Sequence, residues 1–220
     1  MTRALLLSAV AAAALSLAAC NKASNTTANT ASSAADAGSN TASAANPGQT
    51  GPVNQAQDVT GAAVGKMSAA TMGSHDTGAF VSNAVQGNMY ELEAAKLAEQ
   101  KSKNATVKGF AKQMVKDHIA LGNEMKPLIS KAGQTPPADL DQRRKGMLDN
   151  LKAADAASFD KTYADQQVAA HDETLTLMQG YAKDGSDAGL KAAAAKATPT
   201  VQEHLDMAKK MQAEVASKAG

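Results

Sequence analysis

Three histidines of this chain occur in the same local pattern, Val-x-x-His: His118, His171 and His204. Neutral imidazole nitrogens are common ligands of Zn, Cu, Ni and Fe, whereas Ca and Mg prefer more oxygen ligands. The chain has a single cysteine, Cys20, far from these histidines in the sequence. A metal bound by them would therefore be held by nitrogen and oxygen, and the pattern makes the three histidines candidate ligands of a transition metal.

The surroundings of these histidines place them on apolar helix faces. Residues 110–118 and 163–171 align without a gap, and an aromatic residue, Ala, Gln, Val and His coincide at five of nine positions. Most neighbours at a spacing of three or four residues are apolar, so each imidazole is expected to face the core or its margin. A buried, hydrogen-bonded histidine that binds no ligand is the alternative interpretation.

Glu91 is the candidate fourth ligand. With a rise of ~1.5 Å per residue, His118 would lie about 20 Å from the start of its helix and Glu91 about 15 Å from the end of the preceding helix. His171 and His204 would lie roughly 20 and 27 Å from the turn at Gly185. All four groups would thus meet near the middle of a bundle, with Glu93 as the rival of Glu91.

No other group of residues in the sequence indicates a catalytic site. Asp117 and His118, His171 and Asp172, and Glu203 and His204 are sequence neighbours, but adjacent helical residues point about 100° apart and do not readily pair. There is no glycine-rich phosphate loop and no nucleophile motif. The formal net charge is +1 with both signs interspersed. Without a basic stripe, nucleic acid is not an expected partner.

The elements that must position these residues are helices. Aromatic residues make up 3% of the chain, and Ala, Leu, Met, Lys, Gln and Glu are abundant, which favours packed helices over sheet. Gly, Pro and capping residues predict helices over about 77–101, 105–131, 138–154, 158–184 and 187–217, with a kink at Pro199. We expect an all-α domain over residues 75–220, an antiparallel four-helix bundle with one extra short helix. Frequent breaks disfavour an extended coiled coil.

The N-terminal part has the features of an export signal followed by a lipidation motif. Residues 1–19 have an apolar run too short to span a bilayer comfortably, which is typical of an export signal. Leu17-Ala18-Ala19-Cys20 resembles the lipobox of bacterial lipoproteins, in which the cysteine is acylated; an ordinary secretory signal is the alternative. Residues 20–74, rich in Ala, Ser, Thr and Asn, are expected to form a disordered tether from a lipidated Cys20. The last part of this segment, from Val64 to about Ser74, could instead be a loosely docked arm. In a bacterium with two membranes, Asn21 after this cysteine resembles the lipoproteins that are sorted to the outer membrane. We therefore expect the chain to be anchored there and to face the periplasm.

The helical part resembles the bacterial "predicted outer membrane protein" family, domain of unknown function 4142, over about residues 76–215. The resemblance implies a ferritin-like fold and no activity. Di-iron carboxylate bundles place Glu three residues before His, but this chain has Val there, so the standard dinuclear ligand set is absent. The motifs that carry the resemblance are Glu91-Leu92-Glu93, Lys96-Leu97-Ala98, Met114-Val115-Lys116-Asp117-His118, Phe159-Asp160-Lys161-Thr162-Tyr163 with His171, and Pro199 with His204.

Two functions follow as expectations. The first is a non-enzymatic envelope lipoprotein, anchored to the membrane at Cys20, that binds an envelope protein partner or acts in the stress response. The second is a metal-binding or metal-dependent redox protein in which Zn, Cu or Fe is bound by Glu91, His118, His171 and His204. The lack of a catalytic set favours the first, and the shared level of the histidines favours the second.

Overall fold

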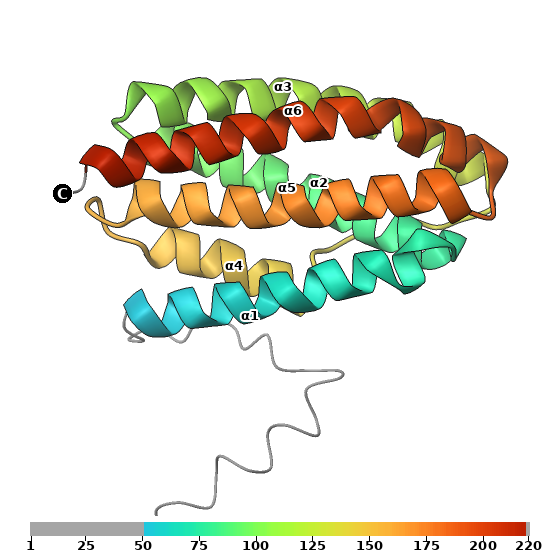
Figure 1. Cartoon of the computed structure of the whole chain (residues 1–220), viewed down its shortest axis with the longest axis horizontal. Helices are drawn as coiled ribbons and strands as arrows, with labels where there is room; N and C mark the ends of the chain where they lie inside the picture. The colour runs from blue at the N-terminus through green and yellow to red at the C-terminus, as the bar shows by residue number, and fades with distance from the viewer. Residues whose placement is uncertain (1–50, 219–220) are drawn as a thin grey trace, which may run out of the picture. The chain divides into compact units, whose positions relative to one another are not determined.

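Four long antiparallel helices form the body of the domain. The computed structural model describes residues 51–218, a range without strands that contains α2 (Thr77–Lys101), α3 (Ala105–Lys131), α5 (Phe159–Asp184) and α6 (Ala188–Lys218). These helices pack in a closed ring, α2 on α3, α3 on α6, α6 on α5 and α5 on α2 (Figure 1). The predicted all-α four-helix bundle is confirmed. The predicted signal peptide, Cys20 and the first part of the predicted tether lie outside the described residues.

Side-chain caps explain why the helices begin where the sequence predicts. Asn104 accepts a hydrogen bond from the backbone N–H of Thr106 at 2.9 Å, and Asp187 accepts one from Leu190 at 2.8 Å, so each satisfies a free donor at a helix start. Ser158 makes no such bond. Helix α6 continues through Pro199.

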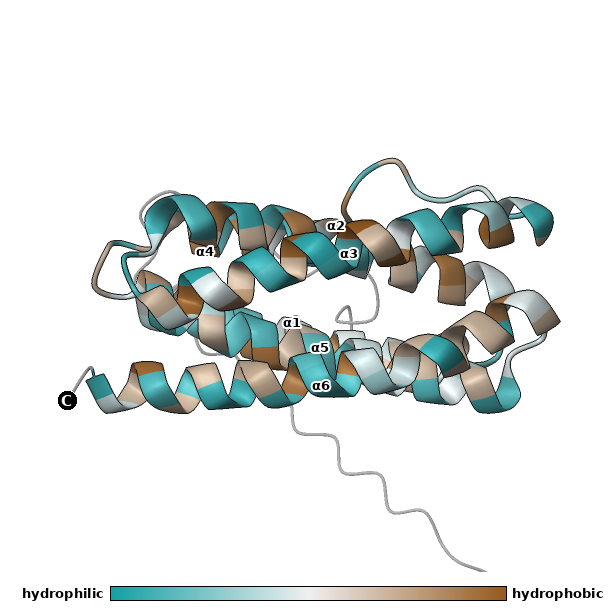
Figure 2. Ribbon diagram, turned by 90° about the horizontal axis from the view of Figure 1, so that it is seen from above, coloured by the Kyte–Doolittle hydropathy of each residue, from teal (hydrophilic) through white to brown (hydrophobic). Residues whose placement is uncertain are grey.

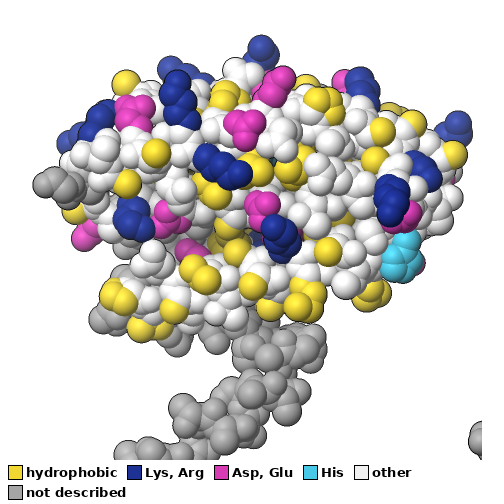
Figure 3. Space-filling view, viewed as in Figure 1, with side chains coloured by type: hydrophobic (Ala, Val, Ile, Leu, Met, Phe, Trp, Pro, Cys, Tyr) yellow, Lys and Arg dark blue, Asp and Glu magenta, His cyan; other side chains and the backbone are white. Residues whose placement is uncertain are grey.

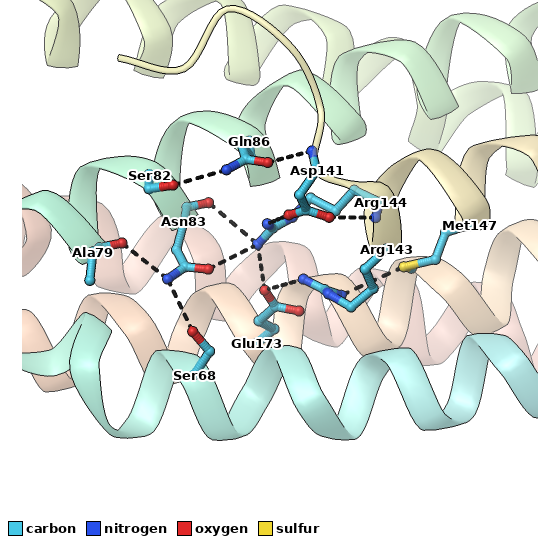
Figure 4. A network of polar contacts seen from close by, with 10 residues as sticks. All are labelled: Ser68, Ala79, Ser82, Asn83, Gln86, Asp141, Arg143, Arg144, Met147 and Glu173. Carbon is cyan, nitrogen blue, oxygen red and sulfur yellow. Dashed lines mark hydrogen bonds and ion pairs between the residues drawn. The ribbon is translucent and has the colours of Figure 1, made fainter. Parts of the chain in front are cut away.

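The extra short helix is α4 (Gln142–Ala153), capped by Asp141. A buried ion-pair network fastens it to α5 (Figure 4). The Arg144 guanidinium donates to Glu173 at 2.5 Å, and Arg143 donates to the same carboxylate at 2.8 Å. Arg144 also pairs with Asp141 and reaches the side chain of Asn83 on α2 at 3.5 Å. These contacts join α2, α4 and α5.

The structure corrects the predicted domain boundary at residue 75. Residues 51–74, expected to belong to the tether, form α1 (Gly51–Ala70) and a single 3-10 turn, Met72–Ser74. Helix α1 packs on α5 and α4 (Figure 1). Its inner face is made of small residues such as Ala69, which is fully buried, and Gly65. Small size permits this close approach, and the same composition led to the prediction of a tether.

The core consists of two apolar clusters, one toward each end of the bundle. One contains Tyr90, Phe110, Tyr163 and Met211, and the other contains Phe80, Leu177, Leu190 and Leu205. Helix α3 contributes Met114 to the first cluster and Leu121 to the second. Figure 2 shows the hydrophobic positions distributed along all the helices. Along α3 and α5 the candidate histidine lies between residues of the two clusters, and on α6 His204 lies close to the point where the second cluster ends at Leu205 and the first begins at Ala208.

The surface is mixed in charge. On the face in Figure 3, Lys and Arg side chains alternate with Asp and Glu side chains, and apolar side chains lie along the edge formed by α1. The exposed apolar residues of α1 include Val59, Val64 and Met67. Among the described residues, no helix has the length and apolar character needed to cross a bilayer.

Candidate metal centre

Helices α3, α5 and α6 each bring one histidine to a shared point inside the bundle. His118, His171 and His204 are 5%, 1% and 2% exposed, and one ring nitrogen from each lies within 4.8 Å of the others. The ring centroids are 5.5 to 5.8 Å apart. Over residues 51–218 this is the one group of three or more His, Cys, Asp or Glu side chains with that geometry. The shared level predicted for the histidines is therefore found.

Each ring uses one nitrogen for a hydrogen bond within the protein. His118 Nδ1 lies 3.0 Å from the amide oxygen of Asn88, His171 Nδ1 lies 2.9 Å from the backbone carbonyl of Gln167, and His204 Nε2 lies 2.9 Å from the Asp117 carboxylate. All three partners are acceptors, so these nitrogens carry the protons. In a neutral ring of this kind the other nitrogen presents a lone pair.

The three remaining nitrogens have no hydrogen-bond partner. They are His118 Nε2, His171 Nε2 and His204 Nδ1, and all are buried. Burial lowers the pKa of His171 to about 4, with His204 adding to this and the bond to Gln167 opposing it. Burial holds the pKa of His118 well below its usual value, and the neighbouring His171 and His204 lower it further. At neutral pH His118 and His171 are thus neutral, the form that binds a metal.

Glu91 is buried but lies outside the group formed by the histidine nitrogens. It follows Asn88 by one turn of α2, and the nearby Gln167 precedes His171 by one turn of α5. The structure therefore places Glu91 about one turn, ~5 Å along the axis, from the histidine level. Its rival Glu93 is exposed.

A second set of unpartnered polar groups surrounds Glu91. Neither carboxylate oxygen of Glu91, neither amide atom of Gln167, nor the Tyr163 hydroxyl has a hydrogen-bond partner of ordinary geometry. Burial raises the pKa of Glu91 to about 8, an effect that the Gln167 amide reduces and the charge of Glu173 increases. Glu91 is therefore mainly protonated at neutral pH.

A cavity of about 440 Å³ opens on the other side of the histidine level. His118 and His171 contribute to its wall, together with apolar side chains that include Val85, Leu121 and Met178. These apolar residues precede Asn88 on α2 and follow the histidines on α3 and α5, the direction opposite to Glu91. The histidines thus separate a buried acidic group from an accessible apolar space.

Sequence reasoning found the three histidines but missed the residues that orient them. Asn88 gave no signal, because an asparagine within a helix has no distinctive pattern. Asp117 was considered only as a neighbour of His118, with which it does not pair. One step along α3 turns its side chain toward α6, where it binds His204. The contact can be predicted only when it is known that α3 and α6 are neighbours in the bundle.

The comparisons identify a family without an activity. A family model described as "Domain of unknown function (DUF4142)" matches residues 62–211. No curated protein and no solved structure matched the chain. The matched range begins within α1 and includes all three histidines, so the second half of α1 and the candidate site lie within the family domain.

Proposed function

We propose that this chain, which belongs to the DUF4142 family, binds one transition-metal ion through His118, His171 and His204. The observation that carries the proposal is the set of unpartnered nitrogens in the three rings, each in a ring whose opposite nitrogen is fixed by an acceptor. Metal-binding histidines typically have such a partner, because it sets the tautomer and the ring orientation.

An energetic argument favours a ligand over a purely structural cluster. A buried polar atom without a partner costs about 1–3 kcal/mol, and most buried polar atoms in proteins are therefore paired. Each of the three rings has one such nitrogen, and the rings meet with one nitrogen of each within 4.8 Å of the others. A bound metal ion would satisfy all three at once, whereas mutual hydrogen bonds would require some of the rings to donate from a nitrogen that carries no proton.

The donor set narrows the choice of metal. Three imidazole nitrogens suit Zn, Cu or Fe better than Ca or Mg. Three protein ligands also leave a coordination position open, as in catalytic zinc sites. We propose Glu91 as a buried acidic neighbour of the metal, since its oxygens have no hydrogen-bond partner of ordinary geometry. The metal would supply Lewis-acid or redox chemistry.

Titration of the metal-free full chain with Zn(II), Cu(II) and Co(II) tests the proposal. We expect one equivalent to bind, and we expect His204→Ala to weaken binding at least 100-fold while the helical circular dichroism is kept. His75→Ala is the matched control, because His75 is exposed and should leave binding unchanged. A folded wild-type chain that binds none of these three ions, nor Fe(II) in the same titration under anaerobic conditions, would exclude a metal site.

We also propose that the chain is exported and lipid-anchored at Cys20, facing the periplasm from the outer membrane. Its support is the sequence pattern at residues 17–20, and two acyl signals or more give stable anchoring without a spanning helix. Expression of the full chain and of Cys20→Ala in a bacterium with two membranes tests this. The wild-type chain should fractionate with membranes, and the variant should appear in the soluble fraction.

A further inference from the structure

The cavity next to the histidines has the properties of a small-molecule site. Its volume of about 440 Å³ falls within the range of roughly 300–1,000 Å³ typical of ligand pockets. The wall is made by α2, α3, α5 and α6 together with the connection at Pro136-Pro137. Val85, Leu121 and Met125 remain only partly buried because the cavity reaches them.

Two polar parts of the cavity wall matter for binding, besides the polar residues Asn88, Asp117, Lys126, Thr174 and Thr200 that also line it. At the inner end, His118 and His171 line the wall, and each is more than nine-tenths buried with an unpartnered Nε2. At the rim, Lys196 of α6 pairs with Glu124 of α3 at 2.9 Å, and both side chains are mainly exposed. Apolar side chains occupy the space between these ends. A molecule that fills the cavity would therefore present apolar surface to the walls and one polar end to the histidines.

We propose that this cavity binds an apolar small molecule with one ligating nitrogen or oxygen atom, and that this atom takes the open coordination position of the metal. The inference rests on the proposed metal site and adds the chemical class of its ligand. Apolar burial would supply most of the affinity, and the metal would fix the orientation of the ligand.

Three probes and the Co(II)-loaded full chain test this assignment. Imidazole has only the ligating end, 1-phenylpyrrole has only the apolar body, and 4-phenylimidazole has both. We expect 4-phenylimidazole to bind at least tenfold more tightly than either of the other probes. It should also change the Co(II) absorption spectrum, because its nitrogen enters the coordination sphere.

Two variants on α6 locate the binding site of the probe. Ala193 lines the cavity and is partly buried, whereas Ala195 is exposed and is not part of the wall. Ala193→Phe should remove the advantage of 4-phenylimidazole over imidazole while Co(II) stays bound, and Ala195→Phe should preserve it. If Ala193→Phe does not fold, Ala120→Phe at the exposed part of the wall serves the same purpose.

The outcomes separate the two proposals. If Co(II) does not bind, both the metal site and the ligand assignment are wrong. If Co(II) binds but imidazole and 4-phenylimidazole have equal affinity, or if the Phe variants at positions 193 and 120 leave the affinity unchanged, the metal site stands and the cavity assignment is overturned.

Discussion

Two buried polar regions lie beside each other in this bundle and differ in how completely their atoms are paired. In the ion-pair network, Glu173 accepts from both Arg143 and Arg144 (Figure 4). In the layer of His118, His171 and His204, one nitrogen of every ring is unpartnered. Glu173 and Arg144 are each 5% exposed, close to the 1–5% of the three histidines. The difference therefore reflects pairing rather than burial.

A helical bundle can thus bury polar groups for two purposes, one structural and one for binding a ligand. The paired network joins α4 to α5 and α2, and its removal would leave uncompensated charge inside the protein. The unpartnered nitrogens of the histidine layer connect no helices to one another. Asn88 and Asp117 hold two of the rings in place through the opposite nitrogens. We interpret the first region as a structural fastening and the second as a site prepared for a ligand.

Removing the shared acceptor of the paired network should have the largest effect on stability. Glu173→Ala leaves two guanidinium groups buried without their common partner, and we expect it to lower the free energy of unfolding by about 3–5 kcal/mol. Glu124→Ala is the control. Its ion pair with Lys196 is exposed, so its loss should cost about 1 kcal/mol or less. Urea unfolding of both variants measures the contrast, and equal costs would contradict it.

Neutralising Glu91 should stabilise the metal-free protein in a pH-dependent way. The folded pKa of about 8 lies above the usual 4.5, so the folded state binds more protons and loses stability as the pH rises from about 4.5 to 8. Glu91→Gln removes this loss. We expect a gain on the order of 2–4 kcal/mol at pH 7 that disappears below pH 4.5. A gain that does not vary with pH would refute the raised pKa.

Glu93→Gln provides the matched control for that measurement. Glu93 lies two residues away on the same helix and is exposed, so its substitution should leave the pH dependence of unfolding unchanged. Urea unfolding at pH 4, 5, 6, 7 and 8 on all three chains then separates the effect of burial from that of removing one negative charge.

Local sequence signals were sufficient for the four long helices and for the level of the histidines. Breakers and caps such as Asn104 and Gly185 are encoded in a few adjacent residues, and the helical rise fixes the height of a side chain once the ends are known. His118, His171 and His204 could therefore be aligned without a structure. Glu91 is not part of the group that the histidine nitrogens form, and the sequence alone could not decide this because the height of Glu91 depends on the offset between neighbouring helices.

Helix α1 could not be predicted in the same way, because its stability comes from contacts distant in sequence. Its residues are mostly small, with Gly61 and Gly65 among them, a composition that weakly favours a helix in isolation. Packing against α4 and α5 compensates for this. Lys66, for example, pairs with Asp172 of α5 at 2.6 Å, a contact across the chain that no local pattern shows.

Gly65→Ala should break the contact between α1 and the paired network. An added Cβ at this position would lie 2.0 Å from a Glu173 carboxylate oxygen and 2.7 Å from the Arg143 guanidinium carbon, so the helix or the ion pairs must move. We expect a loss of about 1–3 kcal/mol. Gly109→Ala on α3 meets nothing within 4 Å and should stabilise by roughly 0.5–1 kcal/mol. Thermal unfolding of both variants would show opposite shifts, and a stabilised Gly65→Ala would mean that α1 does not pack this closely.

The smallest expected effect concerns the orientation of one ring in the unpaired layer. Asp117 accepts from His204 Nε2 at 2.9 Å, and Asp117→Asn keeps the shape of this contact but removes the charge that supports the imidazole as a ligand. We expect a 10- to 100-fold loss of metal affinity with little change in fold, measured by competition with a chelator. Asp172→Asn is the control, because Asp172 follows His171 in the sequence but pairs with Lys66 at the surface. Equal affinities of the two variants would show that the contact with Asp117 orients no ligand, since only one of the two carboxylates touches a ring of the site.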